Sequence, residues 1–170
     1  MTNLWPEQYA GSQQCSVHLP SYISGYVDGE GCFTVSISPR PTLSVGWEVR
    51  PGFSVSQNGD RDEVLLVIQE YFGCGTIRPD RSDRTVKWET RSLVPLLERV
   101  LPHFQRYPLM SGKQRDVELF GGICFRMARG EHRTMAGLHA IAHDASEMNP
   151  SGKRRYRLAD IIGAGVEMKA

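Results

Sequence analysis

The sequence lacks several features that would define a class of protein. It has no run of about 18 apolar residues, so no membrane-spanning helix and no membrane partner are expected. Its first residues, Met1–Glu7, are not basic and then apolar, so no secretory signal is expected. The four cysteines form no C-x-x-C pair, which favours free thiols in a reducing compartment over a zinc site or a disulfide framework.

The chain also has little net charge. Its 20 Lys and Arg residues nearly balance 19 Asp and Glu residues, which leaves a formal charge of +1. A nucleic-acid-binding protein of this composition would have to gather its cations on one surface. Most of these cations are arginines, which suit bidentate recognition of phosphate and guanine. Coding bias in a GC-rich genome would produce the same composition, so the charge alone leaves the partner open.

The 170 residues are enough for one domain with a small appendage. The polar, aperiodic start predicts an N-terminal arm over residues 1–17. The periodic apolar pattern predicts the domain over residues 18–148. Residues 149–170 are expected to form a basic C-terminal loop and a short helix, and the basic run 153–157 is either a set of phosphate contacts or a solvated tail.

The hydrophobic periodicity predicts a helix, two strands, a helix, two strands and further helices. The expected strands span residues 32–38, 42–56, 76–80 and 85–90, with a bend or bulge at Pro51–Gly52 and a helix N-cap within residues 58–60. The expected helices begin near residues 21, 64, 93, 113 and 135. This α-β-β-α-β-β-α order predicts an α+β fold: one four-stranded antiparallel sheet with helices on one face. The open face is either a binding surface or an ordinary solvated face.

The stretch Ser21–Gly31 carries the most specific pattern in the chain. It reads as a helix that ends in two acids, Asp28 and Glu30, set between glycines. Gly25 and Gly29 lie one helical turn apart, so another helix could approach this face closely. The segment Ile23–Gly31 resembles the signature motif of the LAGLIDADG homing endonucleases, although Tyr26 stands where a leucine is usual.

Three later segments extend this resemblance over about residues 18–130, in the order found in the single-motif, homodimeric subgroup of the family. Residues 53–57 resemble the end of its second strand, where Gln57 would close the active site, with Arg61 four residues later. Residues 73–78 resemble the start of its third strand. Residues 111–114 resemble the segment with its active-site lysine, here Lys113.

The resemblance implies roles for individual residues. Glu30 and the carbonyl group of Gly29 would bind Mg²⁺, with Mn²⁺ able to substitute and Ca²⁺ binding without efficient cleavage. Gln57 would orient water, while Lys113 and Arg61 would stabilise charge at phosphorus. Catalysis would therefore depend on Glu30, Gln57, Lys113 and Arg61. The dimer interface would include Ser24, Gly25 and Asp28.

DNA recognition is expected on the open sheet face, since a two-stranded ribbon can read base edges in the major groove. Side chains that alternate in register with Glu30 along the predicted strands would face the DNA. The predicted DNA-binding residues are Thr34, Ser36, Ser38, Arg40, Arg50, Ser54, Arg78, Asp80, Thr85 and Lys87. The same short hydroxyl side chains would also suit a solvated face.

The resemblance implies a site-specific, divalent-metal-dependent homing endonuclease encoded in an intron. It would act as a homodimer on a long, pseudo-palindromic double-stranded DNA target and leave staggered breaks with short 3′ overhangs. The protein would be either a cytoplasmic protein of a bacterium or a protein encoded in an organellar genome. The alternative is an intron RNA maturase or DNA-binding protein with weak or lost cleavage. His139 and His143 have metal-ligand spacing but no third ligand nearby, so a helical pair of ordinary histidines is the competing interpretation.

Overall fold

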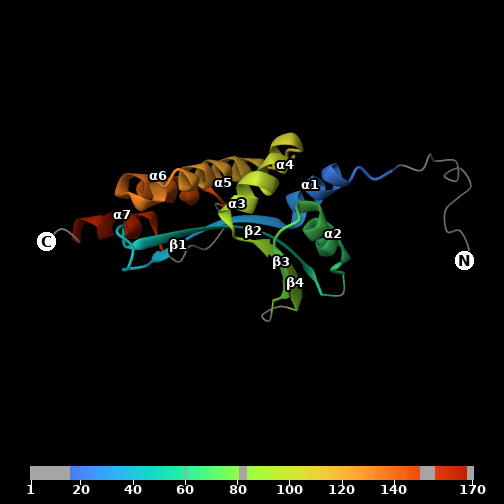
Figure 1. Ribbon diagram of the computed structural model, residues 1–170, viewed down its shortest axis with the longest axis horizontal. Helices are drawn as coiled ribbons and strands as arrows, with labels where there is room; N and C mark the ends of the chain where they lie inside the picture. The colour runs from blue at the N-terminus through green and yellow to red at the C-terminus, as the bar shows by residue number, and fades with distance from the viewer. Residues whose placement is uncertain (1–15, 60, 81–83, 150–155, 168–170) are drawn as a thin grey trace, which may run out of the picture.

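The computed structural model describes residues 16–59, 61–80, 84–149 and 156–167. Its centre is a four-stranded antiparallel sheet in the order β1-β2-β4-β3, with the helices layered over one face (Figure 1). The strands are β1 (Gly31–Pro39), β2 (Trp47–Asn58), β3 (Thr76–Pro79) and β4 (Thr85–Thr90). The predicted α+β class and element order are therefore confirmed.

The helical layer contains nine helical segments within the described residues. They are α1 (Leu19–Glu30), α2 (Glu63–Phe72), α3 (Leu93–Pro95), η2 (Leu96–Val100), α4 (Leu101–Arg106), α5 (Lys113–Ala128), η3 (Glu131–Arg133), α6 (Met135–Glu147) and α7 (Leu158–Glu167). The segments from α3 to α4 follow one another without a break, and η2 between them has π-helical hydrogen bonding. This widening lies next to Pro102, which has no backbone N–H to donate to a helical hydrogen bond.

The strands bury alternate side chains against the helices, as their period of two predicts. The core contains a cross-strand row in which Phe33 of β1 pairs with Phe53 of β2. These two rings stack with 4.5 Å between centroids, and the Trp88 ring meets Phe53 edge-on at 5.4 Å. The neighbouring residues Cys32 and Thr34 point to the opposite, helix-free face and are exposed. One face of the sheet is thus committed to the core, and the other is left open.

Two details of the predicted strands are corrected. The second strand begins at Trp47, not at residue 42, because residues 40–46 form a turn in which Arg40 N–H donates to the Gly46 carbonyl at 2.7 Å. The bend or bulge at Pro51–Gly52 is absent, since Val35 pairs with Pro51 and Thr34 with Gly52 in unbroken register. There β2 has only β1 beside it, because its pairing with β4 begins at Phe53. A proline is tolerated at such a single-sided position.

The start of α2 also differs from the expectation. The helix begins at Glu63, and Asp62 at the N-cap makes no side-chain capping bond. Gly73 ends the same helix in the left-handed conformation with φ of 58°, which glycine adopts without steric cost. Of the segments predicted outside the domain, residues 1–15 and 150–155 lie outside the described residues, while the short C-terminal helix corresponds to α7.

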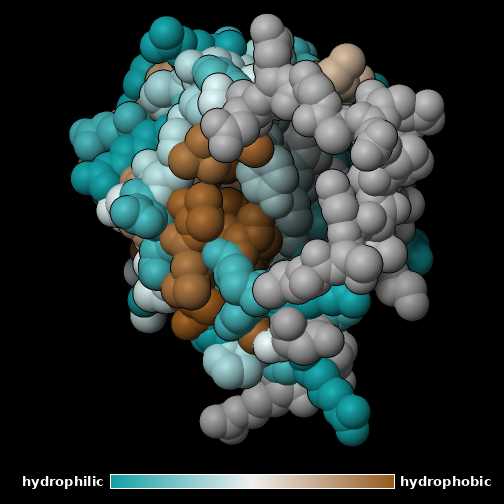
Figure 2. Space-filling model, turned by 90° about the vertical axis from the view of Figure 1, so that its right-hand side faces the viewer, coloured by the Kyte–Doolittle hydropathy of each residue, from teal (hydrophilic) through white to brown (hydrophobic). Residues whose placement is uncertain are grey.

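An apolar patch covers the end of the molecule where α1 and α2 lie (Figure 2). Exposed apolar side chains of these helices are Leu19, 37% exposed, Leu66, 57% exposed, and Val67, 38% exposed. Across the described ranges, no helix is long and apolar enough to cross a membrane.

Candidate active site and nucleic-acid interface

Glu30 is the last residue of α1, and its side chain is exposed. The next residue, Gly31, is buried and begins β1. A Cβ atom at Gly31 would lie 2.5 Å from Val27 Cγ1 and 2.7 Å from the Val27 carbonyl oxygen, so only glycine fits this helix-to-strand junction. The junction therefore fixes the backbone of Glu30, and with it the origin of the side chain, at the point where the helix meets the sheet.

Lys113 lies directly against this helix end. Its Nζ donates hydrogen bonds to the carbonyl oxygens of Val27 at 3.0 Å, Asp28 at 2.8 Å and Gly29 at 3.4 Å. The last carbonyl groups of a helix have no intrahelical partner and carry partial negative charge, which favours a cation at this position. The structure thus brings together Lys113 and Gly29, two residues that the sequence suggested for separate roles.

Asp28 forms the reciprocal contact from α1 to the start of α5. Its Oδ2 accepts hydrogen bonds from the backbone N–H of Met110 at 3.1 Å and of Ser111 at 3.0 Å, and its Oδ1 accepts from the Ser111 hydroxyl. These bonds, the Ser111 hydroxyl foremost, lower the pKa of Asp28, and the Lys113 charge adds to the effect. Asp28 and Lys113 together hold the end of α1 against the start of α5.

Gln57 is placed near the end of β2, beside α1. Its Nε2 donates to the Tyr26 hydroxyl, and its Oε1 accepts from Asn58 N–H at 2.8 Å. Burial raises the pKa of Tyr26, and the bond from Gln57 partly offsets this. Tyr26 was noted in the sequence only as a departure from the usual leucine, and its contact with Gln57 could not have been read from the pattern. Arg61 is exposed, and within the described part of the chain no hydrogen bond or ion pair joins its side chain to the other candidate residues.

Ser24 does not face outward as a dimer-interface residue would. It is only 6% exposed, donates to the Tyr107 carbonyl oxygen at 2.7 Å, and lies 3.1 Å from His103 Nε2. The Ser24 hydroxyl is turned inward, where it provides a hydrogen-bond partner for the Tyr107 carbonyl group and the His103 ring. Gly25 and Gly29 are exposed, and a Cβ on either would meet no atom within 4 Å. The small-residue face of α1 is therefore open.

The ten predicted DNA-binding residues lie on or at the rim of the helix-free face. Strand register places them on a common side, since Ser36 pairs with Arg50, Cys32 with Ser54, and Arg78 with Lys87. Thr34 donates its hydroxyl to the Gly52 carbonyl oxygen at 3.2 Å. The full set is Thr34, Ser36, Ser38, Arg40, Arg50, Ser54, Arg78, Asp80, Thr85 and Lys87.

A model of the family described as LAGLIDADG endonuclease matches residues 23–124, which include most of α1, the whole sheet and most of α5. The chain belongs to the LAGLIDADG endonuclease family. It is 33% identical over 131 residues to a probable intron-encoded endonuclease of Neurospora crassa, covering 76% of this chain and 29% of that protein. It is 29% identical over 150 residues to the homing endonuclease I-ApeII of Aeropyrum pernix, covering 85% of this chain and 88% of that one.

Solved structures of LAGLIDADG proteins show the same fold. The archaeal intron-encoded homing endonuclease I-Vdi141I, complexed with DNA, is 27% identical with a TM-score of 0.81, covering 88% of this chain and 95% of that one. I-SmaMI, bound to uncleaved DNA target in the presence of calcium ions, is 27% identical with a TM-score of 0.77. That match covers 87% of this chain and 49% of the I-SmaMI chain. The family uses divalent metals, and this chain matches about half of the longer I-SmaMI chain.

The donors at the LAGLIDADG helix end suit a hard cation such as Mg²⁺, because they are a carboxylate, from Glu30, and a carbonyl oxygen, from Gly29. Among the described residues no three His, Cys, Asp or Glu side chains gather into a metal site. The pair His139 and His143 therefore gains no third ligand there, and the interpretation as a zinc site is not supported. Asp28, the other carboxylate at this end of α1, accepts bonds from Met110 and Ser111, which leaves Glu30 as the carboxylate of α1 that is open to a metal.

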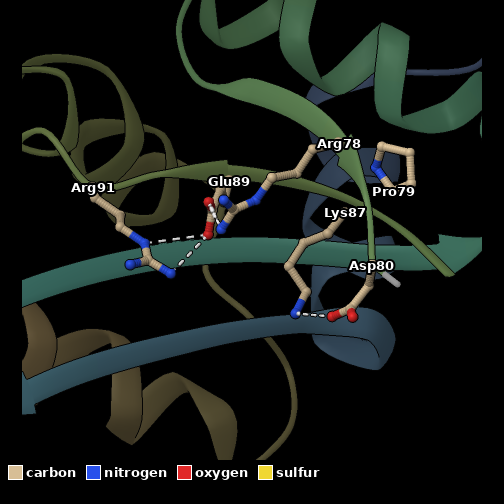
Figure 3. A pocket seen from close by; sticks show the side chains of 6 residues that line it. All are labelled: Arg78, Pro79, Asp80, Lys87, Glu89 and Arg91. Atoms are coloured by element: carbon tan, nitrogen blue, oxygen red, sulfur yellow. Dashed lines mark hydrogen bonds and ion pairs between the residues drawn. The ribbon is translucent and has the colours of Figure 1, made fainter. Parts of the chain in front are cut away.

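The open face also contains charged residues that the prediction passed over. Glu48 contacts both Arg40 and Arg50, and Glu89 contacts both Arg78 and Arg91. An open groove of about 590 Å³ lies along β3 and β4, lined by the residues of Figure 3: Arg78, Pro79, Asp80, Lys87, Glu89 and Arg91. The alternation that selected Thr85 and Lys87 would also have selected Glu89, which lies two residues further along β4.

Proposed function

We propose that the chain is a site-specific homing endonuclease that cuts both strands of a long, pseudo-palindromic DNA target. The observation that carries this proposal is the exposed Glu30 carboxylate, fixed beside Lys113 at the edge of the open sheet face. The target phosphate would lie there while the sheet contacts bases on either side. The reaction would leave staggered ends with short 3′ overhangs.

Glu30 and the Gly29 carbonyl would hold Mg²⁺ or Mn²⁺, which supplies Lewis-acid activation of water and of the scissile phosphate. Ca²⁺ would occupy the same oxygens with longer bonds and permit binding without efficient cleavage. Gln57 would orient the attacking water through its amide, which can donate and accept. Tyr26 supports that orientation, because its hydroxyl accepts a bond from the Gln57 amide.

Lys113 would stabilise negative charge as it develops at phosphorus. Its ammonium is positioned in advance by the three carbonyl groups of α1, so no reorganisation is needed when the substrate arrives. Arg61, exposed just beyond β2, would contact the phosphate from the other side. The catalytic roles would thereby be divided among four residues. Glu30 would bind the metal, Gln57 the water, and both Lys113 and Arg61 the phosphate.

The active species would be a homodimer. Two copies of the Gly25 and Gly29 face can pack backbone to backbone about a two-fold axis, because the space beside each glycine is empty to a distance of 4 Å from where a Cβ atom would lie. The apolar patch of α1 and α2 at the same end would be covered in that arrangement (Figure 2). The two-fold axis would bring both Glu30 carboxylates near the centre of the target and impose approximate symmetry on its sequence.

The rival function is an intron RNA maturase or a DNA-binding protein without efficient cleavage. A selection of cleaved sites from a randomised duplex library, with the purified chain and Mg²⁺, separates the two. Recovery of one long, nearly palindromic site supports the endonuclease. Intron RNA binding, or DNA binding without any cut product in Mg²⁺ or Mn²⁺, would favour the rival. The coding sequence would lie in an intron of a bacterial or organellar gene, and the protein would act in the compartment that contains that genome.

A further inference from the structure

Two Arg–Glu–Arg triads with the same geometry lie on the open face of the sheet. The first contains Arg40, Glu48 and Arg50, and the second contains Arg78, Glu89 and Arg91. In each triad one carboxylate oxygen contacts one arginine and the other oxygen contacts the second arginine. Each acid is therefore paired with two cations from this chain.

The strand register of the two triads is also the same. Glu48 pairs with Ser38 across the β1–β2 ladder, and its first arginine, Arg40, lies two residues after Ser38. Glu89 pairs with Thr76 across the β3–β4 ladder, and its first arginine, Arg78, lies two residues after Thr76. In both cases the second arginine lies two residues after the glutamate. Each glutamate thus joins a diagonal neighbour and a neighbour on its own strand.

Exposure differs between the acids and the bases. The side chain of Glu89 is 12% exposed, whereas those of Arg78 and Arg91 are 57% and 61% exposed. Glu48 is 21% exposed, between Arg40 at 49% and Arg50 at 56%. The carboxylates are thus more buried than the guanidinium groups around them, and Figure 3 shows Arg78 and Arg91 meeting at Glu89 in the second triad.

An arginine held in this way is oriented before it meets DNA. A guanidinium group has five N–H donors, and the pair with glutamate uses only some of them, so the remaining edge can bind the O6 and N7 atoms of guanine. The carboxylate also weakens the attraction to phosphate, because each triad has a net charge of only +1 from two cations and one anion. Non-specific DNA binding depends on phosphate contacts alone, and therefore loses more than base-specific binding does.

We propose that Glu48 and Glu89 are specificity-determining positioning residues: each one aims two arginines at guanine-containing base pairs and withholds them from non-specific phosphate contacts. This inference rests on the proposed function. Along β2, Glu48 and Ser54 are about 20 Å apart at about 3.3 Å per residue, and Ser54 pairs with Glu89. A ribbon in the major groove then places the two triads about six base pairs apart within a half-site, at about 3.4 Å per base step.

The test compares Glu48→Gln and Glu89→Gln with the wild-type chain by two measurements. One is the base-preference profile of the selected target, and the other is the affinity for a non-cognate duplex as a function of salt. Each variant should lose at least about five-fold discrimination at guanine positions near its own triad, with the two affected positions about six base pairs apart. Affinity for the non-cognate duplex should rise several-fold, with a salt slope steeper by about one per chain.

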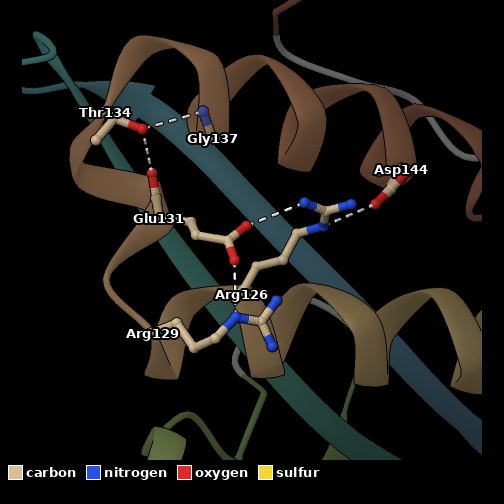
Figure 4. Close-up of polar contacts among 6 residues, drawn as sticks. All are labelled: Arg126, Arg129, Glu131, Thr134, Gly137 and Asp144. Atoms are coloured by element: carbon tan, nitrogen blue, oxygen red, sulfur yellow. Dashed lines mark hydrogen bonds and ion pairs between the residues drawn. The ribbon is translucent and has the colours of Figure 1, made fainter.

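The chain provides a matched control in Glu131, which also holds two arginines, Arg126 at 3.0 Å and Arg129 at 2.7 Å. That cluster ties the end of α5 to η3 in the helical layer, away from the open sheet face (Figure 4). Glu131→Gln removes the same charge and the same kind of contact. It should leave both the base preferences and the non-cognate affinity as in the wild type.

A double-mutant cycle tests whether Glu89 acts through its arginines. In an Arg78→Ala/Arg91→Ala background, Glu89→Gln should change the profile no further. If Glu89 still altered one position there, it would bind a cytosine amino group itself, and the positioning role would be wrong. An unchanged profile in both single variants would also overturn the inference while leaving the endonuclease intact. A wild-type chain that selects no sequence at all would instead refute the proposed function.

Discussion

Lys113 Nζ lies 3.4 Å from the carbonyl oxygen of Gly29, so the ammonium group and the proposed metal would share one oxygen at the end of α1. The same ammonium is bonded to two further helix carbonyls. Lys113 is therefore both a cap of α1 and a fixed cation beside the candidate active site. These two roles make separable predictions.

Lys113→Met should lower single-turnover cleavage by about 100-fold or more, the usual effect of removing one positioned charge-stabilising donor. It should also reduce the free energy of unfolding by about 1–2 kcal/mol, because the carbonyl groups at the end of α1 lose their partner. Chemical denaturation and a cleavage time course on the same preparation measure the two effects. Wild-type cleavage in a destabilised variant would leave Lys113 with the structural role alone.

Glu30→Gln should abolish cleavage while specific DNA binding persists. The change removes a ligand charge and keeps the size of an exposed side chain, so neither the fold nor the sheet face is disturbed. A gel-shift assay and a cleavage assay on the same cognate duplex provide the two readouts. Glu118→Gln, at an exposed position of α5, serves as the charge-matched control and should cut normally. Cleavage by Glu30→Gln at the wild-type rate would rule Glu30 out as the metal ligand.

Replacing Mg²⁺ by Ca²⁺ should leave binding of the cognate duplex intact and suppress its cleavage. Both ions bind oxygen donors, but Ca²⁺ accepts longer bonds and a looser geometry than Mg²⁺. The measurement is single-turnover cutting in each ion after binding has been saturated. Rapid cutting in Ca²⁺ alone would show that the reaction does not depend on tight metal geometry.

Gly25→Leu should separate the two copies and remove dimer and activity together. An exposed leucine would stand where the partner's backbone is expected to approach. Sedimentation with a cognate duplex measures the number of chains per duplex. Gly122→Leu is the control, because Gly122 is an exposed glycine inside α5 with nothing within 4 Å of its Cβ position. A wild-type chain that cuts both strands as one copy per duplex would contradict the dimer.

Stability should fall as the pH drops from about 6.5 to about 4 because of His103. The Ser24 hydroxyl donates its only proton to the Tyr107 carbonyl, so His103 Nε2–H donates to Ser24. In the neutral ring, Nδ1 then accepts from the Tyr71 hydroxyl at 2.9 Å. Burial lowers the pKa of His103 to about 4 from an ordinary 6.5.

Between these pH values His103 is protonated in the unfolded chain and neutral in the folded chain. Protonation therefore lowers the free energy of unfolding by up to about 3 kcal/mol at the acid end of the range. Below about pH 4 this contribution no longer changes. Burial also lowers the pKa of His132, which acts in the same direction. The difference between the pH profiles of wild type and His103→Gln isolates the His103 contribution. Parallel profiles between pH 6.5 and 4.5 would contradict it.

The element order and the open face could be predicted because strand alternation and helix periodicity are local properties of the sequence. The bend expected at Pro51 was wrong because a proline is harmless where a strand has a neighbour on one side only, and strand order cannot be read locally. Ser24 was assigned to the dimer interface from the family resemblance, which does not show the direction of its side chain. Its true direction depends on His103, which lies 79 residues later in the sequence.

The alternation of core-facing and open-face side chains along β1 and β2 has a consequence for the evolution of this protein. The strand residues proposed to meet DNA, such as Thr34 and Arg50, belong to the set that contributes nothing to the aromatic core. Substitutions there leave Phe33, Phe53 and Trp88 untouched, so the recognition surface can change one position at a time at little cost to folding. An intron that depends on such a protein could follow a drifting host gene, or move to a new one, without first having to rebuild the scaffold.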